Sequence, residues 1–180
     1  MLLTYHNCFV KFKIDIDAFF VICYNADNKI LHKRVAMKII SPEQVEAACR
    51  LMSQQIRTQT PQGYAIAAVS RGGLMPAALI AHYLDYKNIL FIRLSSYDSE
   101  QKQSDILDTT TDIIPDSETT YIIDDICDSG ETLRYLRQKY PHAKIFTLIN
   151  KNPTIKPDFA PITEPQGLWI NFPWEPEDRA

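Results

Sequence analysis

The sequence predicts an α/β fold in which helices cover both faces of a mostly parallel sheet. Apolar runs of strand length alternate with stretches of helix length over most of the chain, which is the pattern of strand–helix–strand units. Two of these runs, near 64–70 and 119–124, are followed by short turns that contain glycine and lead into a helix. Because ligands of such sheets bind at the carboxyl ends of the strands, both turns are candidate binding sites.

The elements can be assigned in order from residue 41. Ser41 is suited to cap a helix, Pro42 to occupy its first position and Gln44 to complete a capping box, so a helix is expected to about residue 57. Its apolar residues recur at helical spacing and are expected to face the core: Val45, Ala48, Met52 and Ile56. The other expected elements are strands at 64–70, 89–94, 119–124 and 144–149 and helices at 75–84 and 130–139.

Residues 1–36 differ from the rest of the chain. They are rich in aromatic and β-branched residues, with a turn signal near Asn25, and are expected to form a hairpin. Since Met37 offers an alternative start, we interpret 1–36 as an N-terminal extension or a mispredicted translation start, and 37–180 as the functional domain.

The composition excludes several classes of protein. A net charge of −3 offers no electrostatic surface for nucleic acid. The four cysteines contain no C-x-x-C pair, so neither a zinc site nor a disulfide framework is expected, and a cytoplasmic location is the simplest prediction. No apolar run reaches the roughly 18 residues that a transmembrane helix needs.

The turn that follows 121–123 has the features of a sugar-phosphate site. At a helix N-terminus, the backbone N–H groups of 128–132 would attract phosphate. Asp124 and Asp125 would repel phosphate, so they are better suited to accept hydrogen bonds from ribose hydroxyls or to hold a hard cation such as Mg2+. The alternative is that these carboxylates only cap and solubilise the turn.

The turn after 65–70 is the second candidate site. Gly72 and Gly73 would let the backbone approach a ligand closely, and Arg71 adds a planar charged fork suited to pyrophosphate. Taken alone, the same three residues would describe an ordinary turn with a solvated arginine.

Together with the segments 95–98 and 169–175, the two turns resemble the type I phosphoribosyltransferase family, most closely its xanthine-guanine branch, from about residue 37 to about 175. The resemblance implies transfer of a 5-phosphoribosyl group from phosphoribosyl pyrophosphate (PRPP) to a 6-oxopurine (xanthine, guanine or hypoxanthine), in purine salvage. It also implies Mg2+ as cofactor, a homodimer or homotetramer, and a small C-terminal hood that binds the base.

The resemblance also assigns roles to particular residues. Asp124 and Asp125 would hold ribose and metal, with Asp125 as the metal contact, and Asp128 would be the acid/base group at N7 of the purine. Lys151 would contact the 6-oxo group, while Trp169 and Ile170 would wall the base. The residues expected to bind PRPP are Arg71, Gly72, Asp124, Asp125, Ile126, Cys127, Asp128, Ser129, Gly130, Glu131 and Thr132.

The chain departs from the family pattern at two places. Family members usually carry an arginine in the loop that covers the reaction centre, whereas the long polar segment 97–118 has Lys102 beside Gln103. Lys102 would replace the arginine only as a point charge. Asn152 stands where the family often has proline.

Two other functions share parts of the pattern. A PRPP-binding regulatory protein of the same fold would keep the turn that follows 121–123. A phosphoribosyltransferase for another base would keep it too, but would not need Lys151, Trp169 and Ile170.

Overall fold

The computed structural model describes residues 4–5, 8–15, 18–24, 35–96 and 106–175. Within these ranges the chain forms two compact units. The larger unit comprises 43–166, and the smaller combines described residues of 1–42 with those from 167 onward.

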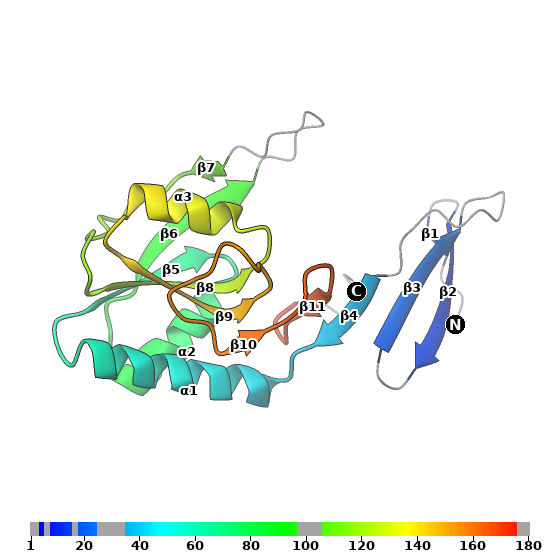
Figure 1. Ribbon diagram of the computed structural model, residues 1–180, viewed down its shortest axis with the longest axis horizontal. Helices are drawn as coiled ribbons and strands as arrows, with labels where there is room; N and C mark the ends of the chain where they lie inside the picture. Colours follow the sequence, from blue (N-terminus) through cyan, green and yellow to red (C-terminus); the bar gives the residue numbers. More distant parts are fainter. Residues whose placement is uncertain (1–3, 6–7, 16–17, 25–34, 97–105, 176–180) are drawn as a thin grey trace. The chain divides into compact units, whose positions relative to one another are not determined.

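The larger unit is built on a six-stranded sheet (Figure 1). Its strands are β5 (Ala65–Ser70), β6 (Leu90–Ser96), β7 (Ile106–Asp108), β8 (Thr120–Cys127), β9 (Lys144–Asn150) and β10 (Ile162–Thr163), in the spatial order β10-β9-β8-β5-β6-β7. All neighbours run parallel except β6 and β7. The mostly parallel sheet predicted from the sequence is therefore confirmed.

Helices lie on both faces of this sheet, as predicted. Helices α1 (Pro42–Gln59) and α2 (Leu74–Leu84) lie on one side of the strands and α3 (Glu131–Lys139) on the other (Figure 1). The expected helix starts at Pro42, where the missing N–H of proline costs nothing. The predicted strands and helices agree with the observed ones to within a few residues at each end.

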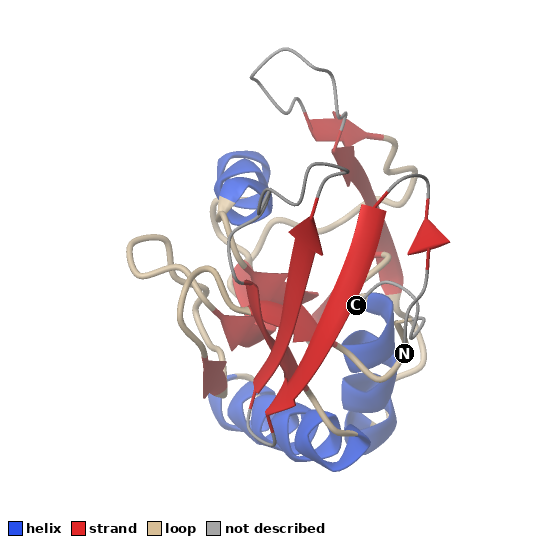
Figure 2. Cartoon of the chain, turned by 90° about the vertical axis from the view of Figure 1, so that its right-hand side faces the viewer, coloured by secondary structure: helices blue, strands red, loops and turns tan. Residues whose placement is uncertain are grey.

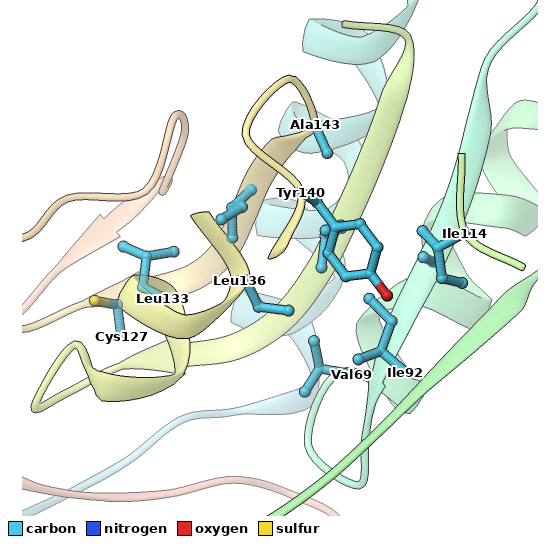
Figure 3. Close-up of a cluster of buried hydrophobic side chains, with 11 residues drawn as sticks. Val69, Ile92, Ile114, Cys127, Leu133, Leu136, Tyr140 and Ala143 are labelled. Carbon is cyan, nitrogen blue, oxygen red and sulfur yellow. The ribbon is translucent and has the colours of Figure 1, made fainter. Parts of the chain in front are cut away.

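The core follows from the alternation of side chains along the central strands. Ala67 and Val69 of β5 belong to the cluster beneath α3, where they meet Leu133 and Leu136 (Figure 3). Their neighbours in sequence point to the opposite face. The predicted apolar stripe of α1 is buried: Val45, Ala48, Met52 and Ile56.

The strand order brings the two candidate turns to the same place. From β5 the chain crosses through α2 to β6 on one side, whereas β8 lies on the other side and crosses through α3 to β9. The order therefore reverses between β5 and β8, which pair in register from Ala65↔Thr120 to Ala68↔Ile123. Such a switch point leaves a crevice at the carboxyl ends of the two strands, where ligands bind in this class of fold.

The smaller unit contains a second sheet, β1-β2-β3-β4-β11 (Figure 2). Its strands are β1 (Thr4–Tyr5), β2 (Cys8–Asp15), β3 (Ala18–Tyr24), β4 (Val35–Ile39) and β11 (Trp169–Asn171). Strand β3 pairs antiparallel with β2, to which 16–17 connect it, and with β4 across the segment of the turn signal near Asn25, which itself lies outside the described residues. Strand β4 includes residue 37 and pairs in parallel with β11.

Candidate active site

The turns after β5 and β8 border one cavity of about 370 Å³. Its walls come from both turns, from the β6–β7 pair and from the start of α3. Of the expected PRPP-binding residues, Gly72 and all of 124–132 line the cavity. Arg71 is exposed and is not among the lining residues.

The turn after β5 is packed too closely for side chains at its two glycines. A β-carbon on Gly72 would overlap the carboxylate of Asp125, and one on Gly73 would overlap the backbone oxygen of Ile123. The backbone N–H of Gly73 donates to the carbonyl of Val69 over 2.8 Å, and α2 begins at the next residue. The peptide bond between Ser70 and Arg71 is cis.

Asp124 and Asp125 lie at the carboxyl end of β8, facing the turn after β5. The backbone N–H of Asp125 donates to Oδ1 of Asp124 over 3.0 Å. Burial and the adjacent Asp125 carboxylate raise the pKa of Asp124 well above its ordinary value. The pair therefore resists carrying two negative charges, and a hard divalent cation beside it would relieve that repulsion.

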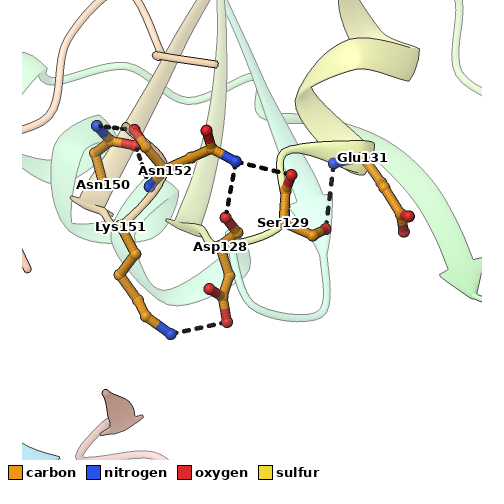
Figure 4. Close-up of polar contacts among 6 residues, drawn as sticks. All are labelled: Asp128, Ser129, Glu131, Asn150, Lys151 and Asn152. Carbon is orange, nitrogen blue, oxygen red and sulfur yellow. Dashed lines mark hydrogen bonds and ion pairs between the residues drawn. The ribbon is translucent and has the colours of Figure 1, made fainter. Parts of the chain in front are cut away.

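The turn after β8 provides the N-terminus of α3 (Figure 4). Gly130 has φ = 82°, a left-handed conformation that favours glycine, and it directly precedes the helix. Oγ of Ser129 accepts a hydrogen bond from the backbone N–H of Glu131 over 3.3 Å. A helix N-terminus carries partial positive charge, so the turn is suited to an anion.

Lys151 follows β9 and reaches the same turn. Its Nζ donates to Oδ2 of Asp128 over 2.8 Å, and its backbone N–H donates to the carbonyl of Cys127 over 2.9 Å. The lysine is buried, whereas Asp128 is exposed at the cavity. The structure thus brings together the two residues predicted to face the base.

Asn152 is a site residue for which the sequence indicated no role beyond a departure from the family pattern. Its side-chain amide donates to the carbonyls of Asp128 and Ser129, and its Oδ1 accepts from the backbone N–H groups of Thr154 and Ile155. The Asn-Pro-Thr sequence at 152–154 is typical of a turn that closes on an asparagine side chain. That signal predicts the contacts within 152–155, but it carries no information about the turn after β8.

Trp169 and Ile170 lie in β11 of the smaller unit, where Trp169 is exposed and Ile170 is buried. Lys102 lies outside the described residues. Burial raises the pKa of Cys127 to about 11, so its thiol is inert at neutral pH, and it donates to the carbonyl of Ile155.

Comparison with known proteins agrees with this geometry. Residues 37–180 match the family model described as the phosphoribosyl transferase domain. The chain is 34% identical over 141 residues to a xanthine-guanine phosphoribosyltransferase of Idiomarina loihiensis, a match that covers 76% of this chain and 85% of the relative.

Solved structures share the fold. A purine phosphoribosyltransferase from Pyrococcus horikoshii superposes with a TM-score of 0.64 at 25% identity, covering 78% of this chain and 94% of that one. A xanthine-guanine-hypoxanthine phosphoribosyltransferase from Helicobacter pylori superposes with a TM-score of 0.65 at 24% identity, covering 79% and 96%. Among the described residues, no helix combines the length and apolar character needed to cross a membrane.

Proposed function

We propose that this chain, which belongs to the phosphoribosyl transferase family, transfers the 5-phosphoribosyl group of PRPP to a ring nitrogen of a 6-oxopurine and releases pyrophosphate. The observation that carries this proposal is the meeting of three chemically distinct parts at one cavity. These are a helix N-terminus suited to phosphate, an adjacent carboxylate pair and the exposed Asp128, whose partner Lys151 is buried behind it and lines a second cavity.

The turn after β8 is proposed to hold the 5′-phosphate of PRPP. The backbone N–H groups of 128–132 stand at the start of α3, where they and the helix dipole favour an anion without any lysine or arginine. Arg71, in the turn after β5, is proposed to share the charge of the pyrophosphate, for which its planar fork is suited.

Asp124 and Asp125 are proposed to hold the ribose hydroxyls, and Asp125 also Mg2+. Their hard oxygen atoms fit this ion, and a cation would offset the burial and the mutual repulsion that raise the pKa of Asp124. Among the described residues no cluster of three or more potential ligands occurs, so the substrate would complete the coordination. When bound, Mg2+ supplies Lewis-acid stabilisation of the charge on the leaving pyrophosphate.

Lys151 and Asp128 are proposed to read the purine. The buried ammonium of Lys151 can donate to a 6-oxo oxygen, and Asp128 can exchange a proton with N7. Adenine presents an amino group at the 6-position, which would offer the ammonium no acceptor beyond the Asp128 carboxylate that it already contacts. A site built around a buried donor rejects such a ligand, by about 10⁴–10⁵ in favourable cases.

The proposal also covers the domain boundaries, the cellular location, the assembly and the substrates. We take 37–180 as the catalytic domain and 1–36 as an extension, and the roles of Trp169 and Ile170 stay predictions of the family resemblance. We place the enzyme in the cytoplasm as a homo-oligomer, acting in purine salvage on xanthine, guanine or hypoxanthine.

The test is to incubate the purified protein with PRPP, Mg2+ and each base in turn, and to follow nucleotide formation. We expect nucleotides from 6-oxopurines and essentially none from adenine. Binding of PRPP without turnover of any base would instead indicate a regulatory protein, and turnover of a pyrimidine would indicate another transferase.

Lys151→Met tests whether Lys151 recognises the 6-oxo group of the purine. Methionine keeps much of the aliphatic stem but has no donor, so kcat/KM for guanine should fall and the ratio of guanine to adenine should narrow at least about tenfold. Because Asp128 is exposed and can be solvated by water, thermal stability should change little. Lys87→Met, at an exposed position outside the cavity, is the matched control. An unchanged guanine-to-adenine ratio in Lys151→Met would remove this residue from the base site.

A further inference from the structure

The side-chain amide of Asn152 joins two segments that are separate in sequence. Its Nδ2 donates to the backbone carbonyls of Asp128 over 3.1 Å and of Ser129 over 2.8 Å (Figure 4). Its Oδ1 accepts from the backbone N–H groups of Thr154 over 3.0 Å and of Ile155 over 2.8 Å. All the hydrogen-bonding capacity of a carboxamide, two donors and two acceptor positions, is thereby used.

These contacts fix the direction of two peptide groups in the turn after β8. In a trans peptide the carbonyl and the N–H of the next residue point in opposite directions. With the carbonyls of Asp128 and Ser129 directed at Asn152, the N–H groups of Ser129 and Gly130 must point away from it. Asp128, Ser129 and Gly130 line the cavity, whereas Asn152 does not. Asn152 therefore binds the turn from the side that faces away from this cavity.

Asn152 is itself held firmly. It is buried, and its backbone is tied to Asn150, whose Oδ1 accepts from the Asn152 N–H and whose Nδ2 donates to the Asn152 carbonyl, each over 3.1 Å. A β-carbon on Gly130 would come within 3.1 Å of Nδ2 of Asn152 and of the Ile155 side chain. The amide therefore lies among the end of strand β9, the 153–155 segment and the turn, and Asn152 also lines a second cavity.

We propose that Asn152 is a positioning residue for phosphate binding: it presents the N–H groups of Ser129 and Gly130 to the 5′-phosphate of PRPP. This inference deepens the proposed function and rests on it for the identity of the ligand. A proline at position 152, as the family pattern often has, offers neither the amide nor the backbone N–H that Asn150 accepts. In this chain the asparagine supplies the preorganisation through its side chain.

Asn152→Asp is the sharpest test because it changes one half of the amide. The carboxylate keeps an acceptor for Thr154 and Ile155 but replaces the donors to the turn with an oxygen that repels both carbonyls. Since Asp128 and Ser129 are exposed, their carbonyls can turn to water and the variant should still fold. Asn152→Ala removes the amide without adding charge, and it carries the test if the aspartate variant does not fold. Asn88→Asp, which makes the same charge change at an exposed position, is the control.

Two measurements decide the proposal. The backbone ¹⁵N order parameters of 129–132 should fall from the roughly 0.85 of rigid backbone to about 0.6 or less in both Asn152 variants and not in Asn88→Asp. The KM for PRPP should rise at least about tenfold, in line with the loss of a supporting contact, while the KM for the purine base stays within about twofold. A residue that served only overall stability would lower the melting temperature without this split.

The outcomes separate this inference from the function on which it rests. Folded Asn152 variants with unchanged order parameters at 129–132, or with an unchanged KM for PRPP, would overturn the role of Asn152. If the native protein neither binds nor turns over PRPP, the proposed function fails. The order parameters of 129–132 then decide alone whether Asn152 holds the turn.

Discussion

The turn after β5 depends on the absence of side chains at its two glycines, whereas the turn after β8 depends on the side chain of one residue, Asn152, which follows β9. Gly72 and Gly73 leave no room for a β-carbon, because the Asp125 carboxylate and the Ile123 carbonyl occupy that space. The second turn instead depends on the Asn152 amide, which bonds the carbonyls of Asp128 and Ser129.

The difference determines which substitutions each turn can accept. An atom added to the first turn would overlap either backbone, at Gly73, or a carboxylate of the proposed site, at Gly72. The second turn would lose the orientation of two peptide groups if the side-chain amide of Asn152 were removed, because that one amide donates to both carbonyls. Adding a methyl group in the first turn and removing a contact near the second should therefore have distinct effects.

The largest effect is expected for Gly73→Ala. Its β-carbon would overlap the carbonyl oxygens of Ile123 and Val69, which belong to the two central strands. Because backbone cannot move aside as a side chain does, we expect about 3 kcal/mol or more of lost stability, beyond the usual range for overpacking. Urea unfolding measures it. Gly63→Ala is the control: it adds the same carbon in open space at φ = 73° and should cost about 1 kcal/mol. Equal losses of stability in Gly73→Ala and Gly63→Ala would contradict the steric crowding inferred at Gly73.

Gly72→Ala should have a smaller effect on stability and a large one on activity. Here the overlapping group is the Asp125 side chain, which can rotate away at little cost to the fold. Displacing it would remove the carboxylate proposed to hold ribose and metal, so kcat/KM for PRPP should fall at least about tenfold. Steady-state kinetics and thermal melting are the measurements. A fully active Gly72→Ala enzyme would show that Asp125 does not serve the reaction from this position.

The smallest effect is expected at Asp108, which ties β7 to α3 away from the turn. Its Oδ2 accepts from Tyr135 over 2.7 Å and from Lys139 over 2.6 Å, and its Oδ1 accepts from the backbone N–H of Thr110 over 2.8 Å. Burial opposes the charge of Asp108, but hydrogen bonds from Lys139, Thr110 and Tyr135 outweigh it and hold its pKa well below the ordinary value.

The sign of the pH dependence follows from that lowered pKa. The ionised carboxylate contributes stability above the unfolded pKa of about 3.9, and the contribution is lost as the pH falls through the lower folded pKa. Asp108→Asn should cost about 1 kcal/mol, because Lys139 is partly exposed. The difference between native protein and variant should be equal at pH 7 and pH 5 and narrower at pH 3. A difference that widens toward low pH would contradict this assignment.

The fold was largely predictable because its signals are local. Apolar strands, the capping signals at Ser41 and Pro42 and the two glycine turns each occupy a few adjacent residues, and together they imply strand–helix–strand units. The pairing of β4 with β11 was not predictable, since short strands from distant parts of the chain carry no signal for each other.

The same distinction applies to the candidate site. Asp124, Asp125 and the turn 128–132 were indicated by their own sequence, and they line the cavity. Asn152 was not indicated, because its function depends on which carbonyls the fold places beside it. Contacts made through tertiary structure have no pattern in a single sequence.

The strand order also governs when such a site can exist during folding. β5 and β8 are neighbours in the sheet, yet α2, β6 and β7 separate them in the chain. Closing so long a loop is entropically costly, so this pairing is among the slower events expected on the folding pathway. Until β5 and β8 have paired, Gly72 and Asp125 have no reason to be near each other. An intermediate that contains either strand–turn–helix unit alone would have half a crevice, and a nascent chain could acquire its ligand only after β8 has been synthesised and docked.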